Sequence, residues 1–581
     1  MMTGDLYAVL ASPGAIVILT ALLGAGLGPT ARAGLYLAGI AASAAILIGY
    51  ETGLVVSFVM LDAPFPVIEL TPLRVDRLSF IFALIFHIAA ALNVIYAWRI
   101  GDRVQDVAGL AYAGAAIGGA LAGDLLTLFI FWEVTAIASA FLVFAPGTRE
   151  SYSAGMRYLV VQILSGLFLL AGLALFAAQG RGLAFEAMSL TVDGGGLDLA
   201  ALALFLAFGI KAAFPFLHNW LQDSYPKASV TGSVVLSAFT TKLAVYALAR
   251  GFPGADPLIY IGAAMTVFPV FFALIENNLR KVLAYSLNNQ VGFMVCAVGV
   301  GTELAINGAA AHAFVHIIYK ALLFMSMGAV LYRTGTVKAT ELGGLYRTMP
   351  ATTVFCIIGA MSISAFPLFS GFVAKSLTMS ALGYEGLFFV WLVLLFASAG
   401  VLEHSGIKIP YFAFFGHDSG KRPKEAPPQM LVAMGIAAAL CIGVGVFPQA
   451  LYAILPYEVT YEPYTADHVV TQMQLLLFAT LAFALLVRFR LYPSEVASTN
   501  LDTDWFYRVP GRAFLGWASA ATRATWIALW GIVSARVHAL MERIYAVHGP
   551  EGQLARSWPI GFMALWTAIL LGFVLVLSFL A

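Results

Sequence analysis

Long apolar stretches recur along the chain and are separated by short polar connections. About 20 apolar residues in a helix cross a bilayer core of about 30 Å, and this length predicts about sixteen membrane-spanning helices. The predicted spans lie near residues 8–27, 33–50, 78–98, 107–122, 125–145, 154–178, 198–222, 229–250, 257–275, 282–300, 304–331, 350–375, 386–404, 429–452, 470–487 and 558–580. Between the second and third spans, prolines and alternating apolar residues in LDAPFPVIELTPLRVDRLS predict extended structure at the membrane surface. The pattern therefore predicts an all-α polytopic membrane protein.

Composition supports a membrane protein and narrows the possible chemistry. Of the 581 residues, 61% are hydrophobic and 10% are charged, against about 25% charged in ordinary soluble chains. A net charge of +1 gives no basic excess that would attract nucleic acid. Cys296, Cys356 and Cys441 lie in apolar stretches without pairing or metal-binding spacing, so we expect no disulfide framework and no metal. Without a phosphate-binding loop or nucleophile motif, we expect no cofactor and no catalytic centre in this chain.

The basic residues gather on one side when the polar connections are assigned alternately to two faces. One face receives Arg32, Arg99, Arg103, Arg149, Arg157, Lys227, Arg280, Lys281, Arg333, Lys338, Arg347, Lys408, Lys421, Arg422, Lys424, Arg488, Arg490, Arg508 and Arg512. The other receives Arg74, Arg77, Arg181 and Arg250, with Glu458, Glu462 and Asp467. Because Lys and Arg are enriched in cytoplasmic loops, we expect the first face to be cytoplasmic and the N-terminus to lie outside. The expected location is the inner (cytoplasmic) membrane of the cell.

Residues 511–548 differ from the spans before them. Trp, Leu and Ile alternate there with Arg523, Arg536 and Arg543. This spacing favours an amphipathic helix along the cytoplasmic interface over a spanning helix, which remains the alternative. Residues 416–429, GHDSGKRPKEAPPQ, are expected to form a solvated loop and are the nearest approach to a linker.

A few charged residues lie well inside apolar spans. They are Glu133, Lys211, Lys242, Lys320 and Lys375. Each costs about 2.5 to 3.5 kcal/mol at the bilayer centre, so a structural role alone does not explain them. Ion pairing between helices or snorkelling to the interface could account for one lysine, but a single glutamate cannot neutralise four lysines. Burial disfavours the ammonium and a nearby carboxylate restores it, so a Lys and a Glu whose separation changes form a switchable proton site.

Two histidines share a helix face with one of these lysines. His312, His316 and Lys320 are spaced i, i+4 and i+8 in the eleventh span. Imidazole titrates near neutral pH, which favours a proton relay over simple packing. A metal site is the weaker alternative, because no carboxylate or cysteine accompanies them on this helix.

Similar interruptions occur in two spans. KAAFPFLHNW contains Pro215, and SISAFPLFSGF contains Pro367 and Gly371. Pro215 cannot donate a hydrogen bond to the carbonyl of Lys211, so we expect the helix to break next to that buried charge. Corresponding breaks in two halves of a chain are typical of inverted-repeat transporters with an ion site at the breaks. Two unrelated proline kinks are the alternative.

Charged residues near span ends are weaker candidates. Asp124 is expected to be interfacial, whereas His218 and Asp223 could line an entrance on the cytoplasmic side. Glu403 and His404 end the thirteenth span and could belong to an exit path. For all of these residues a place at the membrane interface is the simpler alternative.

Several ordered motifs resemble a known family. They are VDRLSFIFALI, GDLLTLFIFWE, GIKAAFPFLHNWLQDSYPKASVTGSVVLSAFTTKLAVYALAR, LRKVLAYSLNNQVGF, HAFVHIIYKALLFMSMG, ELGGLYRTMP and SAFPLFSGFVAK, within about residues 74–416. They resemble the antiporter-like membrane subunits of respiratory complex I and of the multisubunit Mrp cation/proton antiporters. SYPKA, the NQVGF ending, GIKIPYFAFFG and LDTDWFYR are most similar to the D-type Mrp subunit. Gln222 and the stretch ENNLRK depart from the family pattern, and these departures concern the cytoplasmic entrance.

The resemblance implies an organisation and a role for each buried charge. It implies fourteen or more helices, with inverted five-helix repeats at spans four to eight and nine to thirteen and breaks in the seventh and twelfth helices. We expect an N-terminal region at 1–106, the repeats at 107–250 and 251–416, further spanning helices at 417–510 and a lateral helix with a last span at 511–581. Carried over by motif, the proton-translocating residues are Glu133, Lys211, Lys242, His312, His316, Lys320 and Lys375.

The expected function is proton translocation within a complex of several membrane subunits. The D-type subunit of an Mrp-like Na⁺(K⁺)/H⁺ antiporter is the first hypothesis. A proton-pumping subunit of a complex I-like NADH:quinone oxidoreductase or membrane-bound hydrogenase is the alternative within the family. A non-conducting membrane scaffold is the alternative of another class. The expected partners are other membrane subunits, H⁺ with Na⁺ or K⁺, and lipid, but no nucleic acid.

Overall fold

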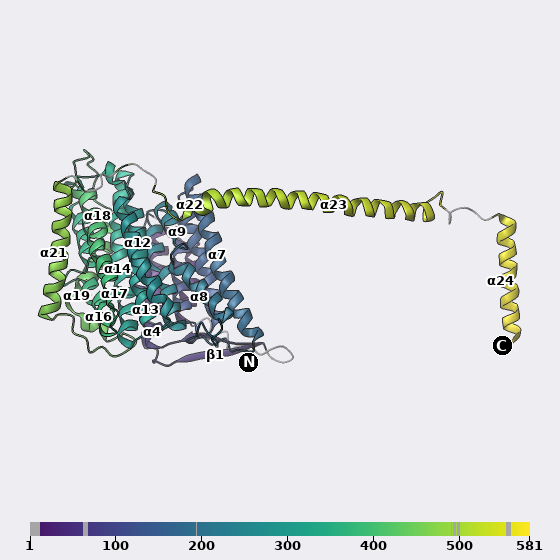
Figure 1. Ribbon diagram of the computed structural model, residues 1–581, viewed down its shortest axis with the longest axis horizontal. Coiled ribbons are helices and arrows are strands. Elements are labelled where there is room, and N and C mark those ends of the chain that lie inside the picture. The colour runs from purple at the N-terminus through teal and green to yellow at the C-terminus, as the bar shows by residue number, and fades with distance from the viewer. Residues whose placement is uncertain are drawn as a thin grey trace. The chain divides into compact units, whose positions relative to one another are not determined.

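The computed structural model describes residues 12–61, 68–100, 102–192, 195–489, 491, 496, 500–552 and 559–580. The chain divides into two compact units, Met1–Asn500 and Leu501–Ala581. In the first unit the helices run side by side, and the β1 strand lies at one end of the bundle (Figure 1). Among the described residues, 13 helices are long and apolar enough to cross a membrane. The all-α polytopic fold is confirmed, but the predicted count of about sixteen spans is not.

The N-terminal helices are followed by a small hairpin. Helices α2 (Pro13–Gly24) and α3 (Pro29–Gly49) precede the antiparallel strands β1 (Val55–Leu61) and β2 (Ile68–Arg74), and α4 (Arg77–Ala97) follows. Strand β2 lies within the segment predicted to be extended. The sequence did not predict β1, which directly precedes that segment.

The helices that follow carry the first group of buried charges. They are α5 (Arg103–Leu121), α6 (Leu125–Phe144), α7 (Arg149–Ala178), α8 (Leu199–Ala212), α9 (Asn219–Ser224), the 3₁₀ turn η1 (Tyr225–Lys227), α10 (Gly232–Ala238) and α11 (Thr240–Gly251). Asp124 caps α6, because its Oδ1 accepts hydrogen bonds from the backbone N–H groups of Leu126 and Thr127, each at 2.8 Å. The backbone N–H of Thr71 in β2 also donates to Asp124 at 2.6 Å, which joins the hairpin to the bundle.

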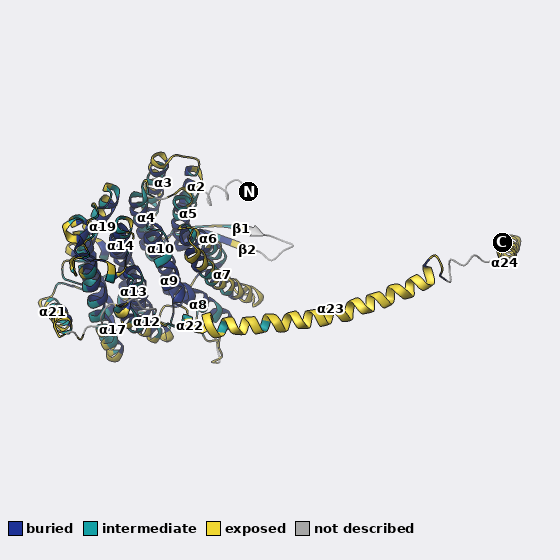
Figure 2. Ribbon diagram, turned by 90° about the horizontal axis from the view of Figure 1, so that it is seen from above, coloured by how far each residue is buried: buried dark blue, intermediate teal, exposed yellow. Residues whose placement is uncertain are grey.

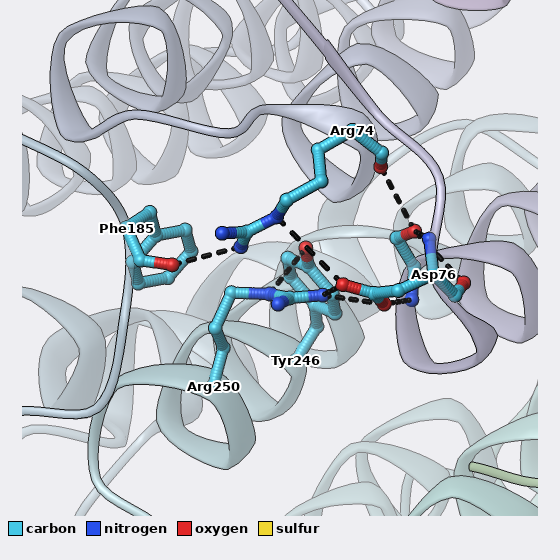
Figure 3. A network of polar contacts seen from close by, with 6 residues as sticks. Arg74, Asp76, Phe185, Tyr246 and Arg250 are labelled. Atoms are coloured by element: carbon cyan, nitrogen blue, oxygen red, sulfur yellow. Dashed lines mark hydrogen bonds and ion pairs between the residues drawn. The ribbon is translucent and has the colours of Figure 1, made fainter. Parts of the chain in front are cut away.

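A second polar network joins β2, α4 and α11 (Figure 3). Asp76 caps α4 by accepting the N–H of Ser79 at 2.8 Å, and Arg250 donates to both Asp76 oxygens at 2.7 Å. Arg74 donates to the carbonyl of Phe185 at 2.8 Å. Burial opposes ionisation of Asp76, but the charge of Arg250, the Ser79 N–H and Arg74 together lower the pKa of this carboxyl below 3.8.

A second group of helices forms the centre of the bundle. They are α12 (Asp256–Ile275), α13 (Leu279–Val300), α14 (Glu303–Thr334), the 3₁₀ turns η2 (Ala339–Glu341) and η3 (Leu345–Arg347), α15 (Pro350–Ile363), α16 (Ser370–Tyr384) and α17 (Phe388–Val401). The helix then continues as the π-helix η4 (Leu402–Ile407), α18 (Lys408–Pro410) and the π-helix η5 (Tyr411–Phe415). In the most apolar stretch of α13, 100% of the residues are buried, and in that of α14, 94% are buried. These two helices are therefore enclosed by other helices of the bundle (Figure 2).

The remaining helices complete each unit. The first unit ends with α19 (Pro428–Val446), α20 (Pro448–Tyr452) and α21 (Ala466–Arg488). The second unit contains α22 (Asp504–Phe506), the π-helix η6 (Tyr507–Gly511), α23 (Arg512–His548) and α24 (Ile560–Leu580). Helix α23 is continuous over 37 residues, about 56 Å at 1.5 Å per residue, and has no buried residue. The helical form expected for 511–548 is confirmed, and its place along the interface stays a prediction.

The two predicted breaks share an unusual backbone. Ala213 and Phe216 flank Pro215 with φ angles of 64° and 68°, and Ala365 and Leu368 flank Pro367 with φ angles of 59° and 72°. Such left-handed conformations are uncommon for residues other than glycine. They occur in the same order around the AFP tripeptide, first between α8 and α9 and again between α15 and α16. The broken seventh and twelfth helices are therefore built alike, which the idea of two unrelated kinks does not explain.

Three spans depart from their predicted form. The span at 229–250 is interrupted at Phe239, because the N–H of Thr240 bonds to the hydroxyl of Tyr112 at 2.8 Å instead of a helical carbonyl. The span at 429–452 divides at Phe447, whose backbone is restricted by Pro448. The span at 386–404 extends to residue 415 through the π-helical turns.

Candidate functional site

Glu133 of α6 and Lys211 of α8 form no ion pair within the described part of the chain. The Nζ of Lys211, on the last turn of α8, is fully buried and donates to the carbonyl of Trp132 at 2.7 Å and to Oγ1 of Thr135 at 3.0 Å. It also lies 4.2 Å from the centre of the Trp132 ring. Oε1 of Glu133 is buried and has no hydrogen-bond partner among the described residues; it packs against Gly166 of α7. The glutamate is thus near enough to act on Lys211 electrostatically but is not locked to it.

Lys242 lies just after the interruption at Phe239. Its side chain is fully buried, and its Nζ donates to the carbonyl of Ser237 at 2.6 Å. That carbonyl is available because the regular α10 helix ends at Ala238. The break that the sequence did not predict therefore supplies the acceptor that holds this lysine in the bundle.

His312 belongs to a hydrogen-bonded cluster between α13 and α14. Its Nε2 lies 3.2 Å from Oε1 of Gln290 and 3.0 Å from the hydroxyl of Tyr319, which donates to Gln290 at 3.1 Å. The ring of His316 lies 5.2 Å from the Tyr319 ring, and neither of its nitrogens has a hydrogen-bond partner within the described chain. His316 also lies within electrostatic range of Lys242. The two ring nitrogens of His316, neither of which is hydrogen-bonded within the described chain, therefore lie within range of Lys242 in the first predicted repeat and Lys320 in the second.

Lys320, two turns after His312, begins a chain of polar side chains. Its Nζ donates to Oγ of Ser286 at 2.8 Å, and Oγ of Ser405 donates to the same oxygen at 2.8 Å. Nδ1 of His404 lies 2.8 Å from Oγ of Ser405. All four side chains are fully buried. The structure thus brings His404, predicted as part of an exit path, into hydrogen-bonded connection with the central lysine.

Lys375 lies on the C-terminal side of the second helix break, whereas Lys211 lies on the N-terminal side of the first. Lys211 precedes its proline, whereas Lys375 follows Pro367 and reaches back to donate to the carbonyl of Ile363 at 2.7 Å. That carbonyl lacks its helical partner because Pro367, four residues on, has no N–H. Gly371 allows the carbonyl of Ser362 to approach, because a Cβ at this position would overlap that oxygen.

A cavity of about 610 Å³ lies next to Lys375. Its polar lining comes from Lys375, Ser376 and Ser398, and from His468 and Gln472 at the start of α21. Lys375 is 3% exposed, so its charge is enclosed except toward this space. A cavity with several polar groups can hold water that receives a proton from the lysine.

The weaker candidates have varied surroundings. Asp223 accepts hydrogen bonds from Arg157 and Lys227, each at 2.7 Å, so two cations already bind its carboxylate. The ring of His218 lies 4.5 Å from that of Phe268. Glu403 is partly exposed on η4 beside the buried His404.

Some polar residues of this arrangement were missed from sequence. Ser286 and Gln290 are four residues apart on α13, and Tyr319 follows His312 by two turns, so helical spacing could have indicated them. Lys408 was assigned to a loop, which is wrong. It is fully buried and donates to the carbonyl of Leu274 at 2.6 Å, at the end of α12. Its burial follows from the π-helical extension of α17, which keeps residues 402–415 in the bundle.

The buried groups share the ability to pass protons. Buried amines, imidazoles and hydroxyls lie on α6, α8, α11, α14 and α16. Each of these groups can take up or release a proton, or carry one through a hydroxyl. The bundle therefore encloses several proton-carrying groups behind an outer surface that is largely apolar.

Comparison with known proteins gives a consistent result. Residues 122–401 match the family described as NADH:quinone oxidoreductase/Mrp antiporter, TM. The D-type subunit of the Na⁺/H⁺ antiporter of Bacillus subtilis is 27% identical over 402 residues, covering 66% of this chain and 78% of that protein. Hydrogenase-4 component B of Escherichia coli is 27% identical over 422 residues, covering 65% of this chain and 62% of that protein.

The fold agrees with a solved structure. A chain of the Mrp complex from Dietzia sp. superposes with a TM-score of 0.74 at 23% identity, covering 92% of this chain and 63% of the other. The chain covers only 56% to 62% of the length of several curated relatives. The family match over residues 122–401 contains Glu133, Lys211, Lys242, Lys320 and Lys375. Over residues 122–401, the chain is thus similar to the family of membrane subunits that NADH:quinone oxidoreductases and Mrp antiporters have in common.

Proposed function

We propose that this chain is a proton-translocating subunit of a multisubunit membrane complex, with the role of a D-type subunit in an Mrp-like Na⁺(K⁺)/H⁺ antiporter. One observation carries the proposal. Lys211, Lys242, Lys320 and Lys375 are enclosed in the bundle, and no carboxylate forms an ion pair with any of them within the described residues. Unpaired amines inside the membrane are costly, and a transport role accounts for their presence.

Protons enter near Lys211 and Lys242, cross by His312, His316 and Lys320, and leave at Lys375. Glu133 sets the charge state of Lys211 by approaching or withdrawing. The open Oε1 of Glu133, the unpartnered nitrogens of His316 and the cavity beside Lys375 support these three steps. His218 and Asp223 are assigned to the entrance, although the two cations bound to Asp223 must release it first.

The complex lies in the inner cell membrane with the N-terminus outside. Basic residues on the face of residues 416–429, including Lys421 and Arg422, support this orientation. The partners are other membrane subunits, and the exposed α23 supplies surface for contact with a subunit or lipid. The repeats at 107–250 and 251–416 are supported by the matched breaks at Pro215 and Pro367.

A redox-pump subunit is the second candidate. The similarity to hydrogenase-4 component B and to an NAD(P)H-quinone oxidoreductase chain 4 from Synechococcus favours it. The subunit list of the purified complex separates the two functions. Co-purifying iron–sulfur protein with redox activity that is independent of Na⁺ and K⁺ would establish the pump.

The test of proton translocation uses Lys211→Ala and Glu133→Ala, each expressed with the native partner subunits. We expect loss of Na⁺- or K⁺-driven changes in the pH gradient of everted membrane vesicles, with normal amounts of assembled complex. Lys338→Ala is the control, because Lys338 is 54% exposed and pairs with Glu341 at the surface. Undiminished exchange in Lys211→Ala would refute the proposal and favour a scaffold.

A further inference from the structure

The segment after α17 has an uncommon helix geometry. Residues Leu402–Ile407 form the π-helix η4, and such turns are rare and concentrate at functional sites. His404 and Ser405, which are neighbours in sequence, are both fully buried. Lys408 follows and caps the end of α12 through the carbonyl of Leu274. The segment is thus fixed at the end of the bundle that is cytoplasmic in the proposed orientation.

The contacts of η4 lead inward to Lys320. Ser405 donates to Ser286 at 2.8 Å, and Lys320 donates to the same Ser286 oxygen at 2.8 Å. Nδ1 of His404 lies 2.8 Å from Oγ of Ser405. Because Ser405 uses its hydroxyl hydrogen toward Ser286, its oxygen accepts from His404 Nδ1–H. The bonds therefore run from His404 through Ser405 to Ser286, whose oxygen also accepts the bond from Lys320.

The outer end of this chain is open. Nε2 of His404 is buried and has no hydrogen-bond partner among the residues that the structure describes. Leaving such a group unpaired carries a desolvation penalty, so a packing role does not account for it. Glu403, the preceding residue, is partly exposed. Gly406 keeps η4 tight against Ser364, because a Cβ there would overlap the Ser364 hydroxyl.

We propose that His404, Ser405 and Ser286 form a second proton input, which charges Lys320 from the cytoplasmic face without passing Lys211. This inference rests on the proposed function. It gives the second predicted repeat its own supply of protons, whereas the route through Lys211 and Lys242 supplies the first. Lys375 and its cavity remain the common outlet.

The transfer conserves protons at each step. A hydronium ion from cytoplasmic water protonates Nε2 of neutral His404, and the imidazolium gives its Nδ1 proton to Oγ of Ser405. Ser405 passes its own hydroxyl proton to Ser286. When the amine of Lys320 is neutral, the Ser286 hydroxyl hydrogen turns toward its lone pair, which reverses the bond seen in the structure, and Ser286 passes that proton to the amine. The imidazole is left neutral with its proton on Nε2, both serines are again hydroxyls, and Lys320 carries the charge. Ring reorientation or proton exchange through water then resets His404.

The experiment compares Ser405→Ala with Ser405→Thr in the assembled complex. We expect the alanine variant to lower the initial rate of cation-driven proton exchange in everted vesicles by about 10-fold, since positioned proton transfer contributes factors of about 10² or more. The threonine variant keeps the hydroxyl and is expected to stay within about 2-fold of wild type. Ser326→Ala is the matched control, because Ser326 is also fully buried, lies on the same helix as Lys320 and bonds to its own helix at Leu322.

A second variant tests transfer rather than packing. His404→Ala is expected to lose transport and to regain it when imidazole is added, which a structural defect would not do. If Ser405→Ala and His404→Ala exchange normally while Lys211→Ala is inactive, the second input is refuted and the proposed function stands. If Ser405→Thr loses as much as Ser405→Ala at normal abundance, packing explains the effect and the input is also refuted. Wild-type exchange in the double variant Lys211→Ala/Ser405→Ala, in which both inputs are blocked, would refute the proposed function itself.

Discussion

Gly166 fixes the position of the Glu133 carboxylate, and this contact can be tested directly. Oε1 of Glu133 lies in the space that a Cβ at Gly166 would occupy. Gly166→Ala must therefore push the carboxylate aside, while the backbone of α7 keeps its conformation. Alanine is the better helix former by about 1 kcal/mol, so we do not expect a loss of stability from the helix itself.

The size of the effect follows from the separation of two charges. At an effective dielectric constant of about 20, unit charges attract by about 3.3 kcal/mol at about 5 Å and by about 2.4 kcal/mol at about 7 Å. From a starting separation beyond ion-pair distance, a displacement of about 2 Å thus changes the coupling of Glu133 to Lys211 by about 0.9 kcal/mol, or about 5-fold in equilibrium. We expect Gly166→Ala to change the rate of proton exchange by a similar factor, because the weaker coupling shifts the equilibrium between the protonated and neutral forms of Lys211.

The assay is cation-driven proton exchange in everted vesicles, normalised to assembled complex. Glu133→Asp provides the partner variant, because its shorter side chain withdraws the carboxylate from residue 166. The double variant Glu133→Asp/Gly166→Ala should exchange faster than Gly166→Ala alone, since neighbouring changes are not additive. Wild-type exchange in Gly166→Ala, or no relief in the double variant, would refute the role assigned to this contact.

Two further predictions concern stability. Asp76→Asn keeps the helix cap but removes the charge that binds Arg250, and it should lower the free energy of unfolding by about 1 kcal/mol at neutral pH. Because the folded pKa of Asp76 lies below 3.8, this stabilisation is present above that pH and is lost as the pH falls through the folded pKa, so thermal unfolding of the two proteins should converge there. Ala213→Gly and Ala365→Gly should raise the unfolding temperature, because a left-handed alanine costs about 1 to 2 kcal/mol and the entropy of glycine offsets only about 0.5 to 1 of that gain. Ala207→Gly, inside α8, should lower it by contrast; a fall at Ala213 and Ala365 as well would contradict the strain argument.

The apolar pattern predicted most of the helices because length and hydropathy suffice to define a membrane span. Both helix breaks were predicted because proline has no backbone N–H, and the buried lysines beside them were recognised from residue type alone. The interruption at Phe239 was missed because its cause, the bond from Thr240 to Tyr112, joins residues that are far apart in sequence. Local rules contain no information about such a partner.

The connections between the buried groups were harder to predict than the groups themselves. Lys320 and His404 were each singled out, but their link requires Ser286 and Ser405, which are ordinary residues in any sequence pattern. The π-helical turns after α17 also escaped prediction, because hydropathy does not distinguish them from an α-helix. As a result Lys408 was placed in a loop although it is buried.

The enclosure of α14 constrains how the protein is made. A newly inserted α14 facing lipid would expose the amine of Lys320, at about 2.5 to 3.5 kcal/mol if charged, and two imidazoles without partners. Its hydrogen-bond acceptors, Ser286 and Gln290, lie on α13 and become useful only when the two helices are already adjacent. Biogenesis must therefore release α14 into a partly assembled bundle rather than into lipid. One of the helices most enclosed in the finished protein is thus one whose insertion depends on its neighbours.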